Sequence, residues 1–162
     1  MKLLLKQKLF SWFDSFDIFD ENGNVRYVVK GNLGFGHQFD IYDATGAYDA
    51  RGSYVGYISE RLFHLRHTFD FDFGTLSGRI VKRITWFNTV IDVYSNADYS
   101  LDGQWPGWDY TVYRDGKPCA TLSKKLFNLT DTYEIEYDDP QDEMMSIVLL
   151  VTIDAIKCDN SR

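Results

Sequence analysis

Residues 139–153 read DPQDEMMSIVLLVTI, a helix start followed by ten residues without a charge. Asp139 can cap a helix, Pro140 suits its first position, and Asp142 follows the cap by three residues. Ten residues fall well short of the roughly 20 that a helix needs to cross a bilayer. The segment therefore predicts a helix over about residues 140–157. Because such a helix is apolar on all sides, it must be enclosed on all sides. The alternative is one more buried strand, since the segment is rich in β-branched residues.

The rest of the chain has the composition of a β protein. Aromatic residues make up 17% of the 162 residues, and acid is supplied by 19 Asp against 5 Glu. Aromatic side chains suit a pleated sheet, whereas a helical bundle favours Glu and Ala. The composition therefore disfavours an all-α protein, and the length predicts a single domain over residues 1–162.

Short alternating runs separated by turn signals predict the strands. The turn signals are Asn22-Gly23-Asn24, Thr45-Gly46, Leu76-Ser77-Gly78, Asp102-Gly103 and Asp115-Gly116. Period-two alternation marks residues 25–30, 38–42, 54–59, 69–73, 79–85, 89–94, 109–113 and 133–137. With less regular pieces, we expect about 11 or 12 antiparallel strands, and about 11 suffice to enclose a helix. The sequence thus predicts a closed antiparallel barrel of about 12 strands around the C-terminal helix.

An internal repeat places one basic residue in each of three segments. Residues 8–18, 61–71 and 125–135 align without gaps, and their first positions are Lys8, Arg61 and Lys125. If the barrel brings the three copies to one rim, these cations could bind a phosphate or an anionic headgroup. The alternative, which we favour, is that the long side chains cover an aromatic rim and protect strand edges.

Four segments of the chain carry a family resemblance. The segments KQKLFSWFD (residues 6–14), FDIFDENGNV (16–25), KLFNLTDTY (125–133) and DPQD (139–142) resemble the LURP-one-related family. The bacterial branch of this family is grouped with tubby-like C-terminal domains and phospholipid scramblases. The resemblance implies a 12-stranded barrel around a hydrophobic C-terminal helix. Tubby-like domains bind phosphoinositides and scramblases move lipids, but neither the tubby lipid motif nor the scramblase calcium segment can be placed on this sequence.

No residue pattern predicts catalysis. Asp70 with Asp72, and Glu134 with Glu136, each share one face of a strand, and paired carboxylates can perform acid and base chemistry. The intervening aromatic and apolar residues indicate the inward face, so the carboxylates are interpreted as a solvent face. A hydrolase that uses them is the weakest alternative.

Histidine and tryptophan give weaker signals. His64 and His67 have a spacing that would suit a metal on a helix, but the repeat places them in a turn, so no metal site is predicted. Trp105 and Trp108 flank a Pro-Gly turn and could contact a partner, whereas the favoured interpretation is that Trp108 closes the barrel mouth.

The formal charge of -7 disfavours a general nucleic-acid binder. Cys119 and Cys158 are far apart and predict free thiols in a reducing compartment, and the first ten residues do not resemble a signal peptide. We therefore expect a cytoplasmic, non-enzymatic binding or scaffold domain without a cofactor or a transmembrane segment, which acts through its outer surface or rim. The alternative is peripheral binding of anionic phospholipid or phosphoinositide headgroups.

Overall fold

A computed structural model describes residues 1–6, 16–32, 36–46, 52–61, 66–105, 107–127 and 130–159. Within these residues, twelve strands form one antiparallel sheet in the order β8-β7-β6-β5-β4-β3-β2-β1-β12-β11-β10-β9. The strands are β1 Lys2–Lys6, β2 Phe16–Asp20, β3 Val25–Gly31, β4 Gln38–Asp43, β5 Ser53–Glu60, β6 Thr68–Asp72, β7 Ser77–Ile84, β8 Thr89–Ser95, β9 Tyr99–Gly103, β10 Tyr110–Arg114, β11 Lys117–Phe127 and β12 Thr130–Tyr137.

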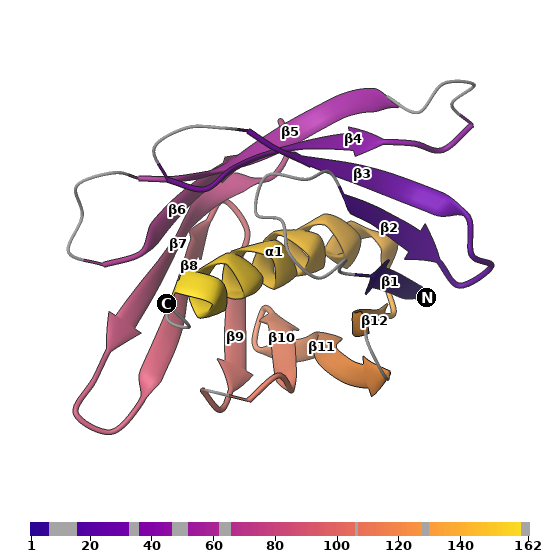
Figure 1. Cartoon of the computed structure of the whole chain (residues 1–162). Helices are drawn as coiled ribbons and strands as arrows, with labels where there is room; N and C mark the ends of the chain where they lie inside the picture. The colour runs from indigo at the N-terminus through magenta and orange to yellow at the C-terminus, as the bar shows by residue number, and fades with distance from the viewer. Residues whose placement is uncertain are drawn as a thin grey trace.

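The sheet curls into a nearly closed barrel around one helix, α1, which spans Glu143–Asp159 (Figure 1). Antiparallel pairing joins the first strand, β1, to the last strand, β12, and β8 and β9 are the two edge strands of the sheet. Nine apolar residues of α1 are at most 3% exposed, namely Met145, Ile147, Val148, Leu149, Leu150, Val151, Ile153, Ala155 and Ile156. The prediction of a barrel that encloses an apolar C-terminal helix is confirmed.

The helix begins as the sequence predicts. A short 3-10 turn over Pro140–Asp142 precedes α1, and the backbone N–H of Gln141 donates to the Asp139 carboxylate at 3.0 Å. This cap satisfies a backbone donor that the first turn would otherwise leave free. The alternative of an additional buried strand over this segment is wrong.

Two of the predicted turn signals overlap the strands beside the turn. Ser77 and Gly78 begin β7 directly after Leu76, and Asp102 and Gly103 end β9, whereas Gly74 takes the positive φ in the turn before β7. A Cβ atom on Gly78 would lie 2.1 Å from the Tyr94 carbonyl oxygen, and one on Gly103 would lie 2.3 Å from the Tyr110 ring. These two glycines therefore serve a close approach between neighbouring strands.

The antiparallel order assigns each loop to one of two rims. Since α1 follows β12, it starts at the rim where the even-numbered strands end. The opposite rim, called the helix-end rim here, is formed by the ends of β1, β3, β5, β7, β9 and β11. Lys157, near the end of α1, contacts the β9–β10 connection at this rim.

Candidate functional site

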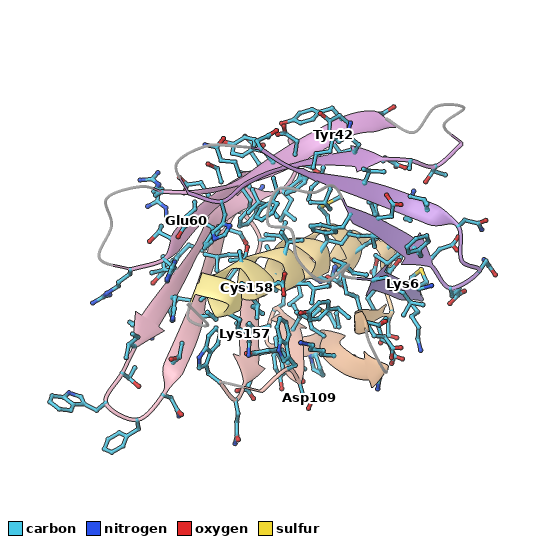
Figure 2. The ribbon with its side chains drawn as sticks, viewed as in Figure 1. Lys6, Tyr42, Glu60, Asp109, Lys157 and Cys158 are labelled. Atoms are coloured by element: carbon cyan, nitrogen blue, oxygen red, sulfur yellow. The ribbon has the colours of Figure 1, made fainter. Side chains whose placement is uncertain are left out.

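Two tryptophans and three lysines gather at the helix-end rim. The Lys157 ammonium lies 4.3 Å from the ring centroid of Trp105 and 4.5 Å from that of Trp108. Lys82 of β7 lies 5.1 Å from the Trp105 ring, and Lys124 of β11 lies 5.3 Å from the Trp108 ring. These five residues are called the tryptophan–lysine cluster below. In Figure 2, Lys157 lies on the side of α1 that faces the segment carrying Asp109.

Lys157 is the centre of this cluster. Its ammonium donates to the carbonyl of Gly107, and the surrounding rings hold it by cation–π attraction. Burial, followed by the nearby charge of Lys124, lowers the pKa of Lys157 to about 8. The cluster therefore fastens the end of α1 to the β9–β10 connection and concentrates positive charge at the mouth of an acidic protein.

Trp105 and Trp108 are both partly buried against the core, and the Trp108 ring lies 4.6 Å from the Tyr133 ring. This placement agrees with a role of Trp108 in covering the barrel mouth. Contact of the two tryptophans with a partner stays a prediction.

Two of the three predicted cations, Arg61 and Lys125, lie among the described residues. Arg61 follows β5 and pairs with Asp70, whereas Lys125 is exposed on β11, and Lys8 lies outside the described residues. Both strands end at the helix-end rim, but they are six strands apart in the sheet order. At about 4.8 Å per strand, Arg61 and Lys125 stand on opposite walls, roughly 20 Å apart. They are therefore too distant to share one phosphate.

Sequence reasoning missed Lys82 and Lys157. Lys82 is only 6% exposed because it follows the buried Ile80 at the inward positions of β7. Lys82 could have been identified as a lysine at an inward position of a strand, but only if it were known which residues of β7 face inward. Lys157 lies 50 residues from Gly107 in the sequence, so no local pattern connects them.

A different network lies where α1 starts. The hydroxyls of Tyr27 and Tyr137 both donate to the carboxylate of Glu143, and the Arg26 guanidinium lies 3.3 Å from it. Burial, together with the hydrogen bond to Glu143, raises the pKa of both tyrosines, which stay protonated donors. These bonds compensate for the burial of a carboxylate in the first turn of the helix.

Asp142 is held in a similar way beside it. Only 1% of Asp142 is exposed, and it accepts a hydrogen bond from Tyr99 at 2.8 Å while Arg114 lies 3.1 Å away. The two networks anchor the start of α1 to β3, β9, β10 and β12. We assign them a structural role, since an arginine neutralises each carboxylate.

The predicted solvent face of β6 is confirmed by burial. Phe69 and Phe71 are at most 2% exposed, whereas Asp70 accepts hydrogen bonds from Arg61 and Arg79. Burial raises the pKa of Asp70, but the hydrogen bonds and charges of the two arginines outweigh it and hold the pKa below its ordinary value. A carboxylate kept ionised in this way is a poor general acid.

The second carboxylate pair has the same arrangement. Lys2 lies 3.4 Å from Glu134 and 2.9 Å from Glu136, and its hydrogen bond lowers the pKa of Glu136. The intervening Ile135 is 1% exposed, as expected for the inward face.

The histidines form no constellation among the residues that the structure describes. His67 contacts the Glu60 carboxylate at 2.8 Å, and His64 lies outside the described residues. Within the described ranges, no group of three His, Cys, Asp or Glu side chains is arranged to hold a metal ion.

An open hollow of about 420 Å³ lies at the rim where α1 starts, and Cys119, Glu136 and Tyr137 are among its lining residues. Burial, followed by the charge of Asp142, raises the pKa of the Cys119 thiol to about 11. The thiol is therefore protonated at neutral pH and is not an activated nucleophile.

Two comparisons with known proteins give a match over most of the chain. In the described part of the chain, no helix has the length and hydropathy to cross a membrane. The chain is 22% identical over 157 residues to the uncharacterized protein YxjI of Bacillus subtilis (strain 168), covering 96% of this chain and 93% of that protein. No solved structure matches the chain. The LURP-one-related sequence profile matches residues 1–154, and the chain therefore belongs to the LURP-one-related family.

Proposed function

We propose that this protein is a non-enzymatic binding domain that acts through the helix-end rim. The observation that carries the proposal is the tip of the β7–β8 hairpin, where Trp86 is 97% exposed, Phe87 is 95% exposed and Ile84 is 75% exposed. The hairpin extends past the end of α1 (Figure 1). Adjacent exposed apolar side chains are typical of a surface that another molecule covers.

The interior of the barrel supports the same proposal. The side chains of α1 fill the space that a lipocalin-like ligand would occupy, since residues such as Ile147 and Leu149 are fully buried. Binding is therefore assigned to the outside of the barrel. The ion-paired carboxylates of β6 and β12 also favour binding over hydrolysis.

Photo-crosslinking in living cells tests this proposal. The photoreactive residue p-benzoylphenylalanine would replace Phe87 at the hairpin tip or, as a matched control, Tyr54, which is 56% exposed on the wall of β5. We expect a discrete adduct from position 87 and none of that size from position 54. Equal adducts from both positions, or none from position 87, would contradict action through this rim.

Peripheral binding of anionic phospholipid headgroups is the second candidate. Exposed tryptophan and phenylalanine are typical of membrane interfaces, and the tip occurs at the same rim as the tryptophan–lysine cluster. The aromatic side chains would enter the interface while the lysines would attract anionic headgroups.

Vesicle flotation separates the two candidates. The full chain would be mixed with phosphatidylcholine vesicles with or without phosphatidylserine or a phosphoinositide, at low and at high salt. The lipid candidate predicts flotation only with anionic vesicles and low salt, and its loss when Trp86 and Phe87 are changed together to Ser. Absence of flotation at low salt, or flotation that the double change leaves intact, would exclude the lipid candidate.

A further inference from the structure

The barrel has one unpaired junction. No ladder of hydrogen bonds joins β8 to β9, although the structure describes both strands in full. Residues 96–98 connect the two strands at one end. Towards the helix-end rim, a hollow of about 190 Å³ is lined by residues 88–91 and 101–105 together with Tyr110. This gap between residues 89–91 and 101–103 is called the seam below.

The ladder between β7 and β8 shows which backbone groups of β8 face the seam. Thr85 N–H donates to the Asn88 carbonyl at 2.8 Å, and Asn96 N–H donates to the Ser77 carbonyl at 3.1 Å. Along an antiparallel ladder, pairs of residues that bond to each other through their backbones alternate with pairs that do not, whose backbone groups point away from each other. The N–H and C=O groups of Thr89, and of every second residue after it, therefore point away from β7 and into the seam.

The other side of the seam follows from the same alternation. Asp115 N–H donates to the Asp98 carbonyl at 2.9 Å, and β9 pairs with β10 without a shift in register. The backbone groups of Leu101 and Gly103 consequently point away from β10 and towards β8. The seam is thus bordered on both sides by strand edges with backbone donors and acceptors that no ladder uses.

One of the residues that line this hollow carries a buried polar atom. Tyr110 is only 5% exposed, and its hydroxyl has no hydrogen-bond partner among the described residues. Burial raises the pKa of Tyr110 to about 12, so the hydroxyl is a protonated donor at neutral pH. An unsatisfied donor at this depth costs stability unless something bonds to it.

We propose that the seam binds an extended peptide segment of another protein, which adds a strand between β8 and β9. Since β8 and β9 are antiparallel, the added strand runs parallel to one and antiparallel to the other. Its backbone would bond to the two free edges over about three residues. The hollow is smaller than the roughly 300–1,000 Å³ of small-molecule pockets, which favours a backbone laid along the edges.

The side chains around the seam specify the chemistry of the segment. Ile91 and Trp105 offer an apolar wall to every second side chain of an added strand. The ammonium groups of Lys82 and Lys157 lie 5.1 Å and 4.3 Å from the Trp105 ring, whereas the charged residue that lines the hollow itself is Asp102. The two lysines therefore favour an acidic residue of the segment beside Trp105, away from Asp102.

The test uses a fluorescein-labelled heptapeptide with blocked ends, in which valine alternates with glutamate and threonine. Binding to the full chain is measured by fluorescence anisotropy. Thr89→Pro removes one N–H donor that faces the seam, and proline is tolerated at the first residue of an edge strand. Thr89→Ala removes the side chain and keeps the donor, so it is the matched control. We expect saturable binding by the wild type and by Thr89→Ala, and a Kd at least about fivefold weaker for Thr89→Pro.

The absence of saturable binding by the wild type, or the same Kd for Thr89→Pro, would overturn the proposal. If Thr89→Pro does not fold, amide exchange of the wild type decides instead. Peptide should slow exchange at Ile91 and Leu101, and unchanged exchange there would overturn the proposal. The change of Trp86 and Phe87 to Ser should leave peptide binding intact, because neither residue lines the hollow at the seam. The peptide site is thus separate from the hairpin tip on which the proposed function rests. Failure at the hairpin tip and failure at the seam are therefore distinguishable.

Discussion

Replacing Leu150 by aspartate should unfold the protein, because Leu150 is 1% exposed at the centre of α1 inside the barrel. Loss of the leucine side chain costs about 2–5 kcal/mol. Protonating an aspartate at pH 7 so that it can be buried costs about 4 kcal/mol, and burying the neutral carboxyl without a partner costs about 1–3 kcal/mol more. Together these costs are about 7–12 kcal/mol, which is comparable to the entire stability of an ordinary domain.

The assay is equilibrium denaturation with thermal melting, followed by circular dichroism. Leu150→Met preserves the volume and should lower the free energy of unfolding by less than about 1.5 kcal/mol. The pH dependence provides a further check. Since burial raises the pKa of the new aspartate, the folded state binds more protons, and the variant should regain about 3 kcal/mol between pH 7 and pH 5. A Leu150→Asp variant that melts cooperatively near the wild-type Tm at pH 7 would refute an enclosed α1.

Three further changes test the contacts that hold α1 at its two ends. Tyr133→Phe removes a 2.8 Å hydrogen bond to Asp154 and should lower the free energy of unfolding by about 1.5–3 kcal/mol in urea denaturation. Arg114→Met leaves the buried Asp142 without its cation and should lower Tm by about 5–15 °C in calorimetry. The pKa of Lys157 is about 8 in the folded chain and 10.5 ordinarily, so the unfolded chain binds more protons between these two pH values. The free energy of unfolding of the wild type should therefore rise with pH over this range, and Lys157→Gln should remove that rise.

Each change has a control that alters the same chemistry elsewhere. Tyr94 is 61% exposed, and Tyr94→Phe should leave stability within about 0.5 kcal/mol of the wild type. Arg79→Met removes a surface pair with Asp70 and should lower Tm by less than about 4 °C. The exposed Lys117, changed to Gln, should keep the pH dependence of the wild type. If a control variant changed stability as much as the variant it is paired with, the role assigned to that contact at the end of α1 would be wrong.

Much of the fold was predictable because its signals are local. The cap at Asp139 and the uncharged run after it specify the helix, and alternation specifies strands such as β6. The turn signals Leu76-Ser77-Gly78 and Asp102-Gly103, whose glycines lie in strands next to the turns, show where local reasoning fails. A glycine can be required because the backbone adopts a positive φ or because a neighbouring strand approaches too closely for a Cβ atom. The local sequence does not show which of these two reasons applies.

The candidate site was less predictable, because it depends on register and on distant contacts. Trp105 and Trp108 were recognised from their spacing, but the lysines around them come from β7, β11 and α1. The repeat aligned Lys8, Arg61 and Lys125, yet the two of them that the structure describes, Arg61 and Lys125, lie at strands six places apart in the sheet. The seam could not have been predicted at all, since no feature of the sequence shows which pair of neighbouring strands is left without a ladder.

The claim on which the functional proposal depends is that α1 permanently fills the barrel, which leaves the rim and the seam for binding. Hydrogen exchange of the α1 amides in the purified chain, at several low denaturant concentrations, measures this directly. The account predicts that amides of residues 145–156 open only with the free energy of global unfolding, because the helix cannot leave without unfolding the barrel. Opening free energies several kcal/mol below the global value would contradict it, because the interior would then be accessible to a ligand.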